Sequence, residues 1–218
     1  DGSMYGGGIV FSGGSFPVTP GAFQTVYGGG DTGGNGPVDI GIIKLSPDGS
    51  SRMYATYIGG SGNEQPHSLI VDNQGNLILA GRSSSPNYPL RNPNSSASQI
   101  GAGGGFDIVV TKLNATGTDL IGSKKIGGSG DDGVNISITR GLNSLQRNYG
   151  DDGRSEVILD GAGNVYAASS TQSTNFPVTG GAFQSTSGGG AQDGVVLKLA
   201  PDLSSLTFAS FLGGSGND

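Results

Sequence analysis

The stretch that decides the fold is Asp39-Ile-Gly-Ile-Ile-Lys-Leu45, followed after a turn by Met53-Tyr-Ala-Thr-Tyr-Ile58-Gly-Gly-Ser-Gly-Asn63. Its apolar, β-branched and aromatic runs are short and are bounded by Gly, Asn, Asp and Pro, which is typical of strands joined by turns. The same pattern returns from Asp107 and from Asp193, and each copy ends in Gly-Gly-Ser-Gly. The chain is therefore built from repeats.

The spacing of these copies indicates three repeats and one insertion. Asp39 and Asp107 are 107 − 39 = 68 residues apart, whereas Asp107 and Asp193 are 193 − 107 = 86 apart. The excess lies in residues 131–150, and removing these 20 leaves 218 − 20 = 198 residues, or three units of 66. We expect one continuous section, residues 1–218, with units of approximately 1–62, 63–130 and 150–218 and an insertion, 131–150, within the third unit.

Each unit carries about four runs with strand character. In the middle unit we expect strands over 68–71, 77–80, 108–113 and roughly 120–126, and the first unit lacks its opening strand. Four hairpin-connected strands are the content of one propeller blade, and radial repetition limits the exposed edges of such sheets. No segment has sustained helical periodicity. We therefore predict an all-β fold, a β-propeller section with about three four-stranded antiparallel blades of a larger propeller.

Composition narrows the class of protein. Of 218 residues 44 are Gly and none is Cys, charged residues make up 13%, and the formal net charge is −6. An acidic chain without a basic stripe argues against nucleic-acid binding, and no apolar run approaches the roughly 20 residues of a membrane span. The absence of Cys removes thiol nucleophiles, thiolate metal sites and disulfides. The sequence thus indicates a strand-rich domain with few catalytic side chains.

A further marker supports a resemblance to a known family. Phe16-Pro-Val-Thr-Pro-Gly-Ala-Phe-Gln24 recurs with one change at 176–184. Together with the Asp-x-x-x-x-Lys-Leu and Tyr-Ala-Thr-Tyr-Ile-Gly-Gly-Ser-Gly-Asn blocks, it resembles the bacterial SBBP repeat, a β-propeller repeat of large exported proteins. The resemblance is close over 16–64 and nearly as close over 150–218, and it is weaker over 82–106.

The resemblance implies an extracellular or bacterial cell-surface protein, associated with the outer membrane, that binds or scaffolds and has no catalytic residues. We expect partners among other cell-surface or secretion-machinery proteins, glycans as a further class, and the remaining blades of the same or a larger polypeptide. Neither nucleic acid nor a membrane span is expected. The resulting prediction is a non-catalytic module for protein–protein or surface interaction in a bacterial envelope or secretion context.

The loops after Gly-Gly-Ser-Gly are acidic and raise a second hypothesis. Ca²⁺ takes six to eight oxygen ligands, which acidic Gly-rich loops can supply. The candidate ligands are Asn63, Glu64, Asp131, Asp132, Asp151 and Asp152. On this alternative the chain is a Ca²⁺-dependent, lectin-like glycan-binding propeller, and no other cofactor is expected. Turn chemistry also explains these loops, so both interpretations stay open.

Three equivalent acids, Asp39, Asp107 and Asp193, raise a related choice. A ring of carboxylates lining a channel would bind cations. We favour the other interpretation, in which each Asp accepts hydrogen bonds from backbone amides at a strand start.

The insertion is the one unrepeated feature. Arg140, Arg147 and Tyr149 form a basic-aromatic group on an acidic chain, and Arg and Tyr are enriched at protein interfaces. We predict these three as partner-binding residues, against the alternative of a tolerated surface insertion.

An enzymatic alternative rests on few side chains. Asp151, Asp152 and Glu156 would supply paired carboxylates for a glycan-active enzyme. His67 is the only His, and the sequence has no Gly-x-Ser-x-Gly motif that would supply a serine nucleophile beside it. We predict that His67 is a surface or strand-edge residue.

Overall fold

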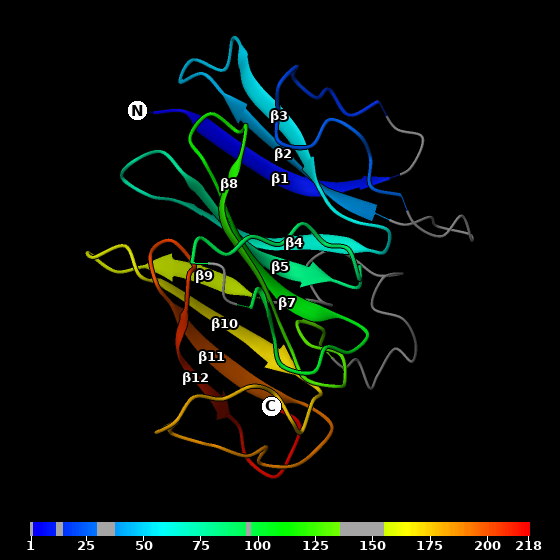
Figure 1. Ribbon diagram of the computed structural model, residues 1–218, viewed down its shortest axis with the longest axis vertical. Helices are drawn as coiled ribbons and strands as arrows, with labels where there is room; N and C mark the ends of the chain where they lie inside the picture. Colours follow the sequence, from blue (N-terminus) through cyan, green and yellow to red (C-terminus); the bar gives the residue numbers. More distant parts are fainter. Residues whose placement is uncertain (1, 12–14, 30–37, 95–96, 136–154) are drawn as a thin grey trace.

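A computed structural model describes residues 2–11, 15–29, 38–94, 97–135 and 155–218 (Figure 1). Within these ranges no residue is helical, and so no helix there could span a membrane. The strands form three separate sheets, antiparallel throughout except for one short parallel pair. The predicted all-β class is confirmed.

The first sheet contains β1 (Met4–Phe11), β2 (Val38–Leu45) and β3 (Arg52–Ile58), in that order. The second contains, in order across the sheet, β4 (Glu64–Val71), β5 (Leu77–Ser83), β7 (Asp107–Leu113), β8 (Leu120–Ile126) and β6 (Gln99–Ile100). The third contains β9 (Glu156–Leu159), β10 (Val165–Thr171), β11 (Asp193–Leu199) and β12 (Leu206–Leu212), with β9 and β12 at its edges.

Repeated turn chemistry fixes the hairpins. Between β4 and β5, one carboxylate oxygen of Asp72 accepts hydrogen bonds from the amides of Gln74 and Asn76, both at 2.9 Å. Gly75 has a φ of 81°, a left-handed conformation that Gly adopts without steric cost. The β9–β10 turn repeats this arrangement around Asp160, where Gly163 has a φ of 82°. Asp and Gly at fixed spacing therefore set the same turn in two units.

The four strands expected in the middle unit are all present, and β6 adds a fifth. This two-residue strand pairs in parallel with β8 and lies in 82–106, where the sequence departs from the repeat. The amides of Lys125 and Gly127 donate to the carbonyls of Ser98 and Ile100, at 3.0 and 3.1 Å. The segment thus covers the outer edge of β8, which would otherwise present unpaired backbone groups.

The sheets stack in sequence order and every stacking contact has the same polarity. Successive residues of a strand point to opposite faces of its sheet. In β7, Val109 packs in the core shared with the first sheet, whereas Ile108 and Val110 pack in the core shared with the third. We call the face of each sheet that points toward the preceding sheet its leading face, and the opposite one its trailing face.

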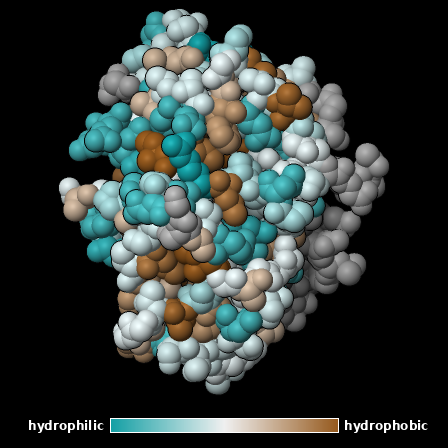
Figure 2. Space-filling view, viewed as in Figure 1, coloured by the Kyte–Doolittle hydropathy of each residue, from teal (hydrophilic) through white to brown (hydrophobic). Residues whose placement is uncertain are grey.

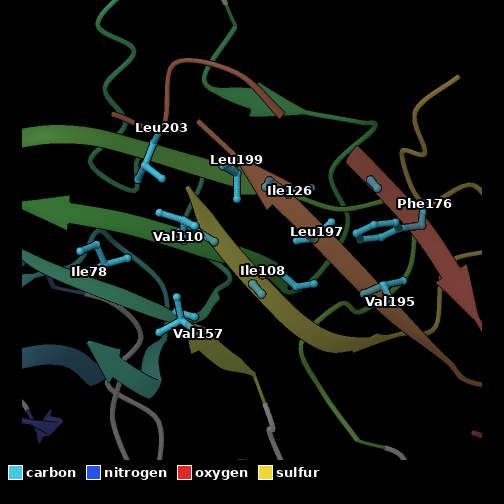
Figure 3. Packing of buried hydrophobic residues seen from close by; sticks show 14 of the residues in the cluster. Ile78, Ile108, Val110, Ile126, Val157, Phe176, Val195, Leu197, Leu199 and Leu203 are labelled. Atoms are coloured by element: carbon cyan, nitrogen blue, oxygen red, sulfur yellow. The ribbon is translucent and has the colours of Figure 1, made fainter. Parts of the chain in front are cut away.

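The two apolar cores lie between trailing and leading faces. The first joins Ile40, Ile42 and Ile58, on the trailing face of the first sheet, to leading-face residues of the second such as Leu79 and Leu113. The second core joins the trailing face of the second sheet to a leading face built from Val195, Leu197, Leu199, Phe176 and Phe211 (Figure 3). One junction geometry is therefore used twice.

The opening strands lie on one side of the stack. β4 contacts β9, and it also contacts β1 and β2 of the first sheet. Head-to-tail stacking with neighbouring opening strands agrees with a radial arrangement of blades, but the described strands do not close into a ring. Propeller closure stays a prediction.

Candidate functional site

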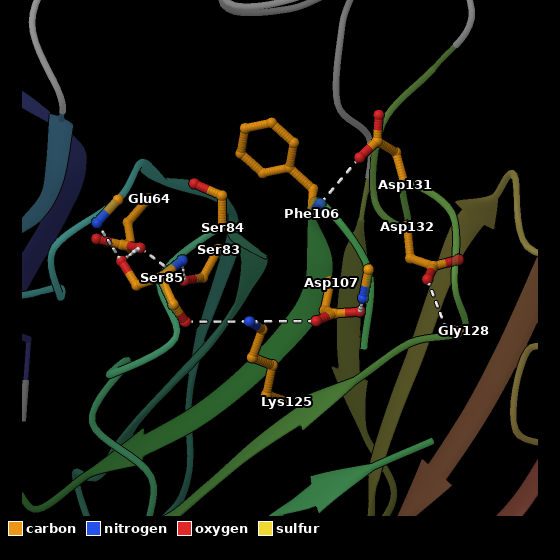
Figure 4. Close-up of polar contacts among 12 residues, drawn as sticks. Glu64, Ser83, Ser84, Ser85, Phe106, Asp107, Lys125, Gly128, Asp131 and Asp132 are labelled. Carbon is orange, nitrogen blue, oxygen red and sulfur yellow. Dashed lines mark hydrogen bonds and ion pairs between the residues drawn. The ribbon is translucent and has the colours of Figure 1, made fainter. Parts of the chain in front are cut away.

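The acidic loops predicted to bind Ca²⁺ lie at the two junctions between sheets. Glu64 begins β4 and is fully buried. Its carboxylate accepts hydrogen bonds from the Gly60 amide at 2.9 Å and from the hydroxyls of Ser83 and Ser85, the former at 2.6 Å (Figure 4). Gly60 follows the last strand of the first sheet, whereas Ser83 ends β5 of the second sheet and Ser85 lies two residues further on. Glu64 therefore ties the loop that leaves one sheet to the next sheet.

Asp132 makes the same contacts at the second junction. It is fully buried and accepts from the Gly128 amide at 2.7 Å, from the Ser173 hydroxyl at 3.0 Å and from the Thr171 hydroxyl. Asp218 holds the equivalent position after the third sheet, where it accepts from the Gly214 amide at 2.7 Å and is exposed. We call this unit, one acid with a glycine amide and two hydroxyls, the junction clamp.

The other candidate ligands cap strand starts. Asn63 Oδ1 accepts from the Val38 amide at 3.2 Å, and Asp131 Oδ1 accepts from the Phe106 amide at 2.9 Å (Figure 4). Within the described ranges no three Asp, Glu or His side chains converge in a way that could hold a metal ion. Asp151 and Asp152 lie outside the described residues. Where they are described, the candidate ligands are engaged with protein donors.

The repeated Asp of β2, β7 and β11 accepts backbone hydrogen bonds, as favoured above. Asp39 accepts from the Gly28 amide at 2.7 Å, Asp107 from the Gly104 amide at 3.3 Å, and Asp193 from an amide at 3.0 Å and a hydroxyl at 2.6 Å. All three carboxylates are almost completely buried. The channel-lining interpretation does not hold for side chains in this position.

Asp39 and Asp107 are each also close to a clamp acid. A Cβ added to Gly59 would overlap Asp39 Oδ1 and would lie 2.8 Å from Glu64 Oε2. At Gly127 it would overlap Asp107 Oδ1 and lie 2.6 Å from Asp132 Oδ2. Glycine is therefore required between the two acids, and each junction contains a buried carboxylate pair.

Burial and like charge make these pairs hold protons more tightly than usual. Burial raises the pKa of Asp39 to about 6; the Gly28 amide lowers this pKa, and the neighbouring Glu64 raises it. Burial also raises the pKa of Asp132 to about 6, to which the charge of Asp107 contributes. Asp39 Oδ1 accepts no hydrogen bond, and in the protonated form this oxygen could donate to Glu64.

The second junction adds a cation. Lys125 occupies the place of Tyr57 and Phe211 in the other units, and its ammonium lies 3.2 Å from Asp107 Oδ2. It also donates to the Ser85 carbonyl at 3.0 Å (Figure 4). The sequence signal was the pair Lys124-Lys125, which stands where the first unit has Thr56-Tyr57. This pair marked a departure from the repeat, but it did not indicate the partner of Lys125.

His67 lies in β4, the edge strand of its sheet, and is partly buried. Its Nδ1 is 3.0 Å from the Ser155 hydroxyl, and that hydroxyl is 2.8 Å from Ser169. Burial lowers the pKa of His67 to about 3, with a further contribution from Arg82, so the imidazole is neutral at pH 7. Ser155 is only 1% exposed, which gives a substrate no access to its hydroxyl.

The acids of the enzymatic alternative are not brought together by described contacts. Glu156 begins β9 and accepts a hydrogen bond from the Ser68 hydroxyl of β4 at 3.1 Å. Asp151 and Asp152 lie outside the described residues, and so do the predicted partner-binding residues Arg140, Arg147 and Tyr149.

Among the described residues, no other sheet packs on two of the sheet faces. The leading face of the first sheet forms a groove of about 570 Å³, lined by Gly8, Val10, Phe16, Gly41 and Ile43 among others. At the other end of the stack, Leu212 is 53% exposed, whereas its equivalents Ile58 and Ile126 are fully buried. Figure 2 shows further apolar residues in separate patches divided by polar ones. Both ends of the stack therefore carry open apolar surface at a definite place in the repeat.

No protein-family model matches the chain, and no curated protein has a significantly similar sequence. The resemblance to the SBBP repeat therefore stays a prediction made from the residues.

Proposed function

We propose that the chain is a non-catalytic section of an exported β-propeller, which serves as an interaction and scaffolding module at a bacterial cell surface. The observation that carries the proposal is the head-to-tail stacking of successive sheets, sealed at each junction by the same clamp. Such stacking builds a rigid framework from repeats that contact only their neighbours.

The blade arrangement is supported by the equivalence of the two junctions. Ile40 and Ile42 of β2 and Ile108 and Val110 of β7 occupy the same positions and enter successive cores. The clamp acids Glu64 and Asp132 bind the same class of donors. Radial repetition requires that each sheet be related to the next by the same rotation, which would place equivalent residues in equivalent contacts at every junction.

The absence of catalysis is supported by how polar groups are used. An acid or base acts on a substrate only if the substrate can reach it within hydrogen-bond distance. Glu64, Asp107 and Asp132 are fully buried, and Ser155, beside the only His, is nearly so. These groups hold sheets together, which leaves loops and open faces for binding, where partner contacts usually lie on a rigid scaffold.

Capture of partners tests this function. The purified chain, immobilised, is incubated with solubilised envelope proteins and with secreted proteins of a bacterium that encodes it. We expect at least one protein to be retained by the wild type and lost from the variant with Arg140, Arg147 and Tyr149 all changed to Ala. The matched control changes Arg52, an exposed residue at the start of β3, to Ala and should retain the same protein. Turnover of a glycan or peptide substrate by the chain, or retention of no protein, would refute the proposal.

A further inference from the structure

One position of the repeat carries residues of opposite size at the two junctions. Tyr54 lies in β3, opposite Lys44 of β2. Gly122 lies in β8, opposite Lys112 of β7, which is the same Lys of the repeat. Both residues are buried on the trailing faces of their sheets. The first trailing face therefore has a large side chain at this point, and the second has none.

The turns that face these positions have the opposite assignment. Gly117 belongs to the β7–β8 turn of the second sheet, and Leu203 belongs to the β11–β12 turn of the third. The two turns are equivalent, since each of these amides donates to the carbonyl three residues earlier at 2.9 Å. Their φ angles, 71° and 60°, are also alike. The second sheet thus presents a glycine where the third presents a leucine.

At each junction one large residue fits against one glycine. A Cβ added to Gly117 would lie 2.4 Å from the Tyr54 ring. A Cβ added to Gly122 would lie 2.8 Å from the Leu203 Cβ and 2.3 Å from the Asp202 carbonyl oxygen. These approaches are far inside the separation of about 3.5–4.0 Å at which carbon atoms attract. Both glycines are therefore required by the residue that faces them.

Leu203 holds its position against a backbone penalty. Within the described ranges it is the only residue other than glycine with a positive φ, and this conformation is unfavourable for a residue with a Cβ. The equivalent turns have Gly49 and Gly117, which adopt it freely. Leu203 is nevertheless fully buried in the second core (Figure 3). A strained residue that is kept in place by its surroundings suggests a specific role.

We propose that these two pairs determine which sheet docks on which, so that each trailing face accepts only its own successor. The third sheet on the first would bring Leu203 against Tyr54, and two large side chains would compete for one space. The second sheet on the second sheet of another copy would bring Gly117 against Gly122 and leave a cavity. Overpacking and cavities both destabilise a core.

Similar repeats need a device of this kind. Misassembly between domains is a characteristic failure of repeat proteins, and specificity requires that wrong pairings be disfavoured as well as right ones favoured. The junction clamp uses the same class of groups at both junctions and cannot distinguish them. The two pairs can, because large and small residues change sides between the junctions.

A double substitution at the first junction tests the pairing, with the melting temperature of the full chain as the readout. Gly117→Leu should lower it by roughly 5–10 °C, because the new side chain overlaps the Tyr54 ring. In the Tyr54→Ala background the same change fills the space of the ring and should lower it much less, or raise it. Gly49→Leu is the matched control: it has the same φ of 71°, its Cβ would approach only the Met4 Cε, and its effect should be equal in both backgrounds.

Leu203→Gly tests the second junction without introducing a larger side chain. The substitution removes the backbone penalty, so it would raise the melting temperature if Leu203 had no packing role. We expect a lower melting temperature instead, because a cavity opens beside Gly122. A rise would overturn the proposal.

Refolding separates specificity from packing. Tyr54→Ala with Gly117→Leu gives both junctions the same assignment, so the first trailing face also accepts Leu203. After unfolding in urea and dilution, size-exclusion chromatography measures the fraction of chains that return to the starting species. We expect a lower fraction for this double variant than for the wild type and for Gly49→Leu. Equal fractions, or an equal effect of Gly117→Leu in both backgrounds, would overturn the inference. The proposed function would then still stand, because partner capture does not depend on these pairs.

Discussion

Asp39 and Asp107 are equivalent residues with different neighbours, and replacing each by Asn should change stability in opposite directions. Asp39 pairs with Glu64 in a buried site, and Tyr57 occupies the position that is Lys125 in the second unit. An amide at 39 can still accept from the Gly28 amide, and its NH₂ group can donate to Glu64. Asp39→Asn therefore removes a repelling buried charge and keeps the hydrogen bonds.

The expected gain depends on pH with a definite sign. The pKa of Asp39 rises from 3.8 to about 6 in the folded protein, a difference of 6 − 3.8 = 2.2. At about 1.36 kcal/mol per unit of pKa, this amounts to at most about 3 kcal/mol. Because the folded pKa is raised, the wild-type contribution is fully present below pH 3.8 and is lost as pH rises through about 6. Asn does not titrate, so the advantage of Asp39→Asn should grow from near zero at pH 4 to about 1–3 kcal/mol at pH 7.

Asp107→Asn is the matched control. It removes the partner of a buried ammonium 3.2 Å away and should lower the free energy of unfolding at pH 7 by up to about 3 kcal/mol. Both variants are measured by urea unfolding, followed by circular dichroism, at unit steps from pH 4 to pH 8. If the difference between Asp39→Asn and the wild type were the same at pH 4 and pH 7, or if the variant were less stable at pH 7, the account of the carboxylate pair would be wrong.

Three other outcomes are expected. In Gly128→Ala the new Cβ would overlap Ser173, which follows β10, and the variant should lower the free energy of unfolding in urea by about 1–3 kcal/mol. Gly214 holds the same position after the third sheet, and a Cβ there meets no atom closer than 3.7 Å, so Gly214→Ala should leave stability unchanged. Equal effects of the two variants would contradict the role of the junction. Lys112→Met breaks a 2.8 Å ion pair with Asp72 that is nearly buried and should cost about 3 kcal/mol, whereas Arg91→Met breaks an exposed pair and should cost under about 1 kcal/mol. Addition of Ca²⁺ or of a chelator should leave the melting temperature unchanged by calorimetry, because the described clamp acids already accept protein hydrogen bonds; a rise with Ca²⁺ would favour the lectin-like alternative.

The strands and turns could be predicted from the sequence because both are encoded locally. The Asp72 turn and the strand over 108–113 follow from residues a few positions apart. β6 was missed because it lies where the repeat pattern fails, and its pairing with β8 depends on backbone contacts rather than on an apolar run. The segment that leads into β6 also explains why Lys124 is tolerated in β8, because the Lys124 ammonium donates a hydrogen bond to the Ala97 carbonyl at 2.9 Å.

The clamps were beyond a local interpretation. Glu64 and Asp132 follow Gly-rich loops and therefore suggested Ca²⁺ ligands, but their hydroxyl donors lie 19 to 41 residues further along the chain. A signal was present in the alternating hydroxyls of Ser83-Ser-Ser85 and Thr171-Gln-Ser173 at the end of each second strand. Two hydroxyls on one face at the same place in two repeats indicate a shared acceptor, and the repeat spacing would have pointed to the acid.

Because of the junction clamp, the segment that could be transferred between proteins does not have the same boundaries as the sequence repeat. A cut placed after the acid would separate it from both of its hydroxyl donors, because the acid and the hydroxyls lie on the same side of the loop and the glycine lies on the other. A cassette for lengthening the array should instead run from one clamp glycine to the next, from Gly60 to Gly128, so that each inserted copy brings the acid for its own entry and the glycine for its successor. Insertion of this cassette would then extend the stack by one sheet, and the new junction would contain the same clamp as the existing ones.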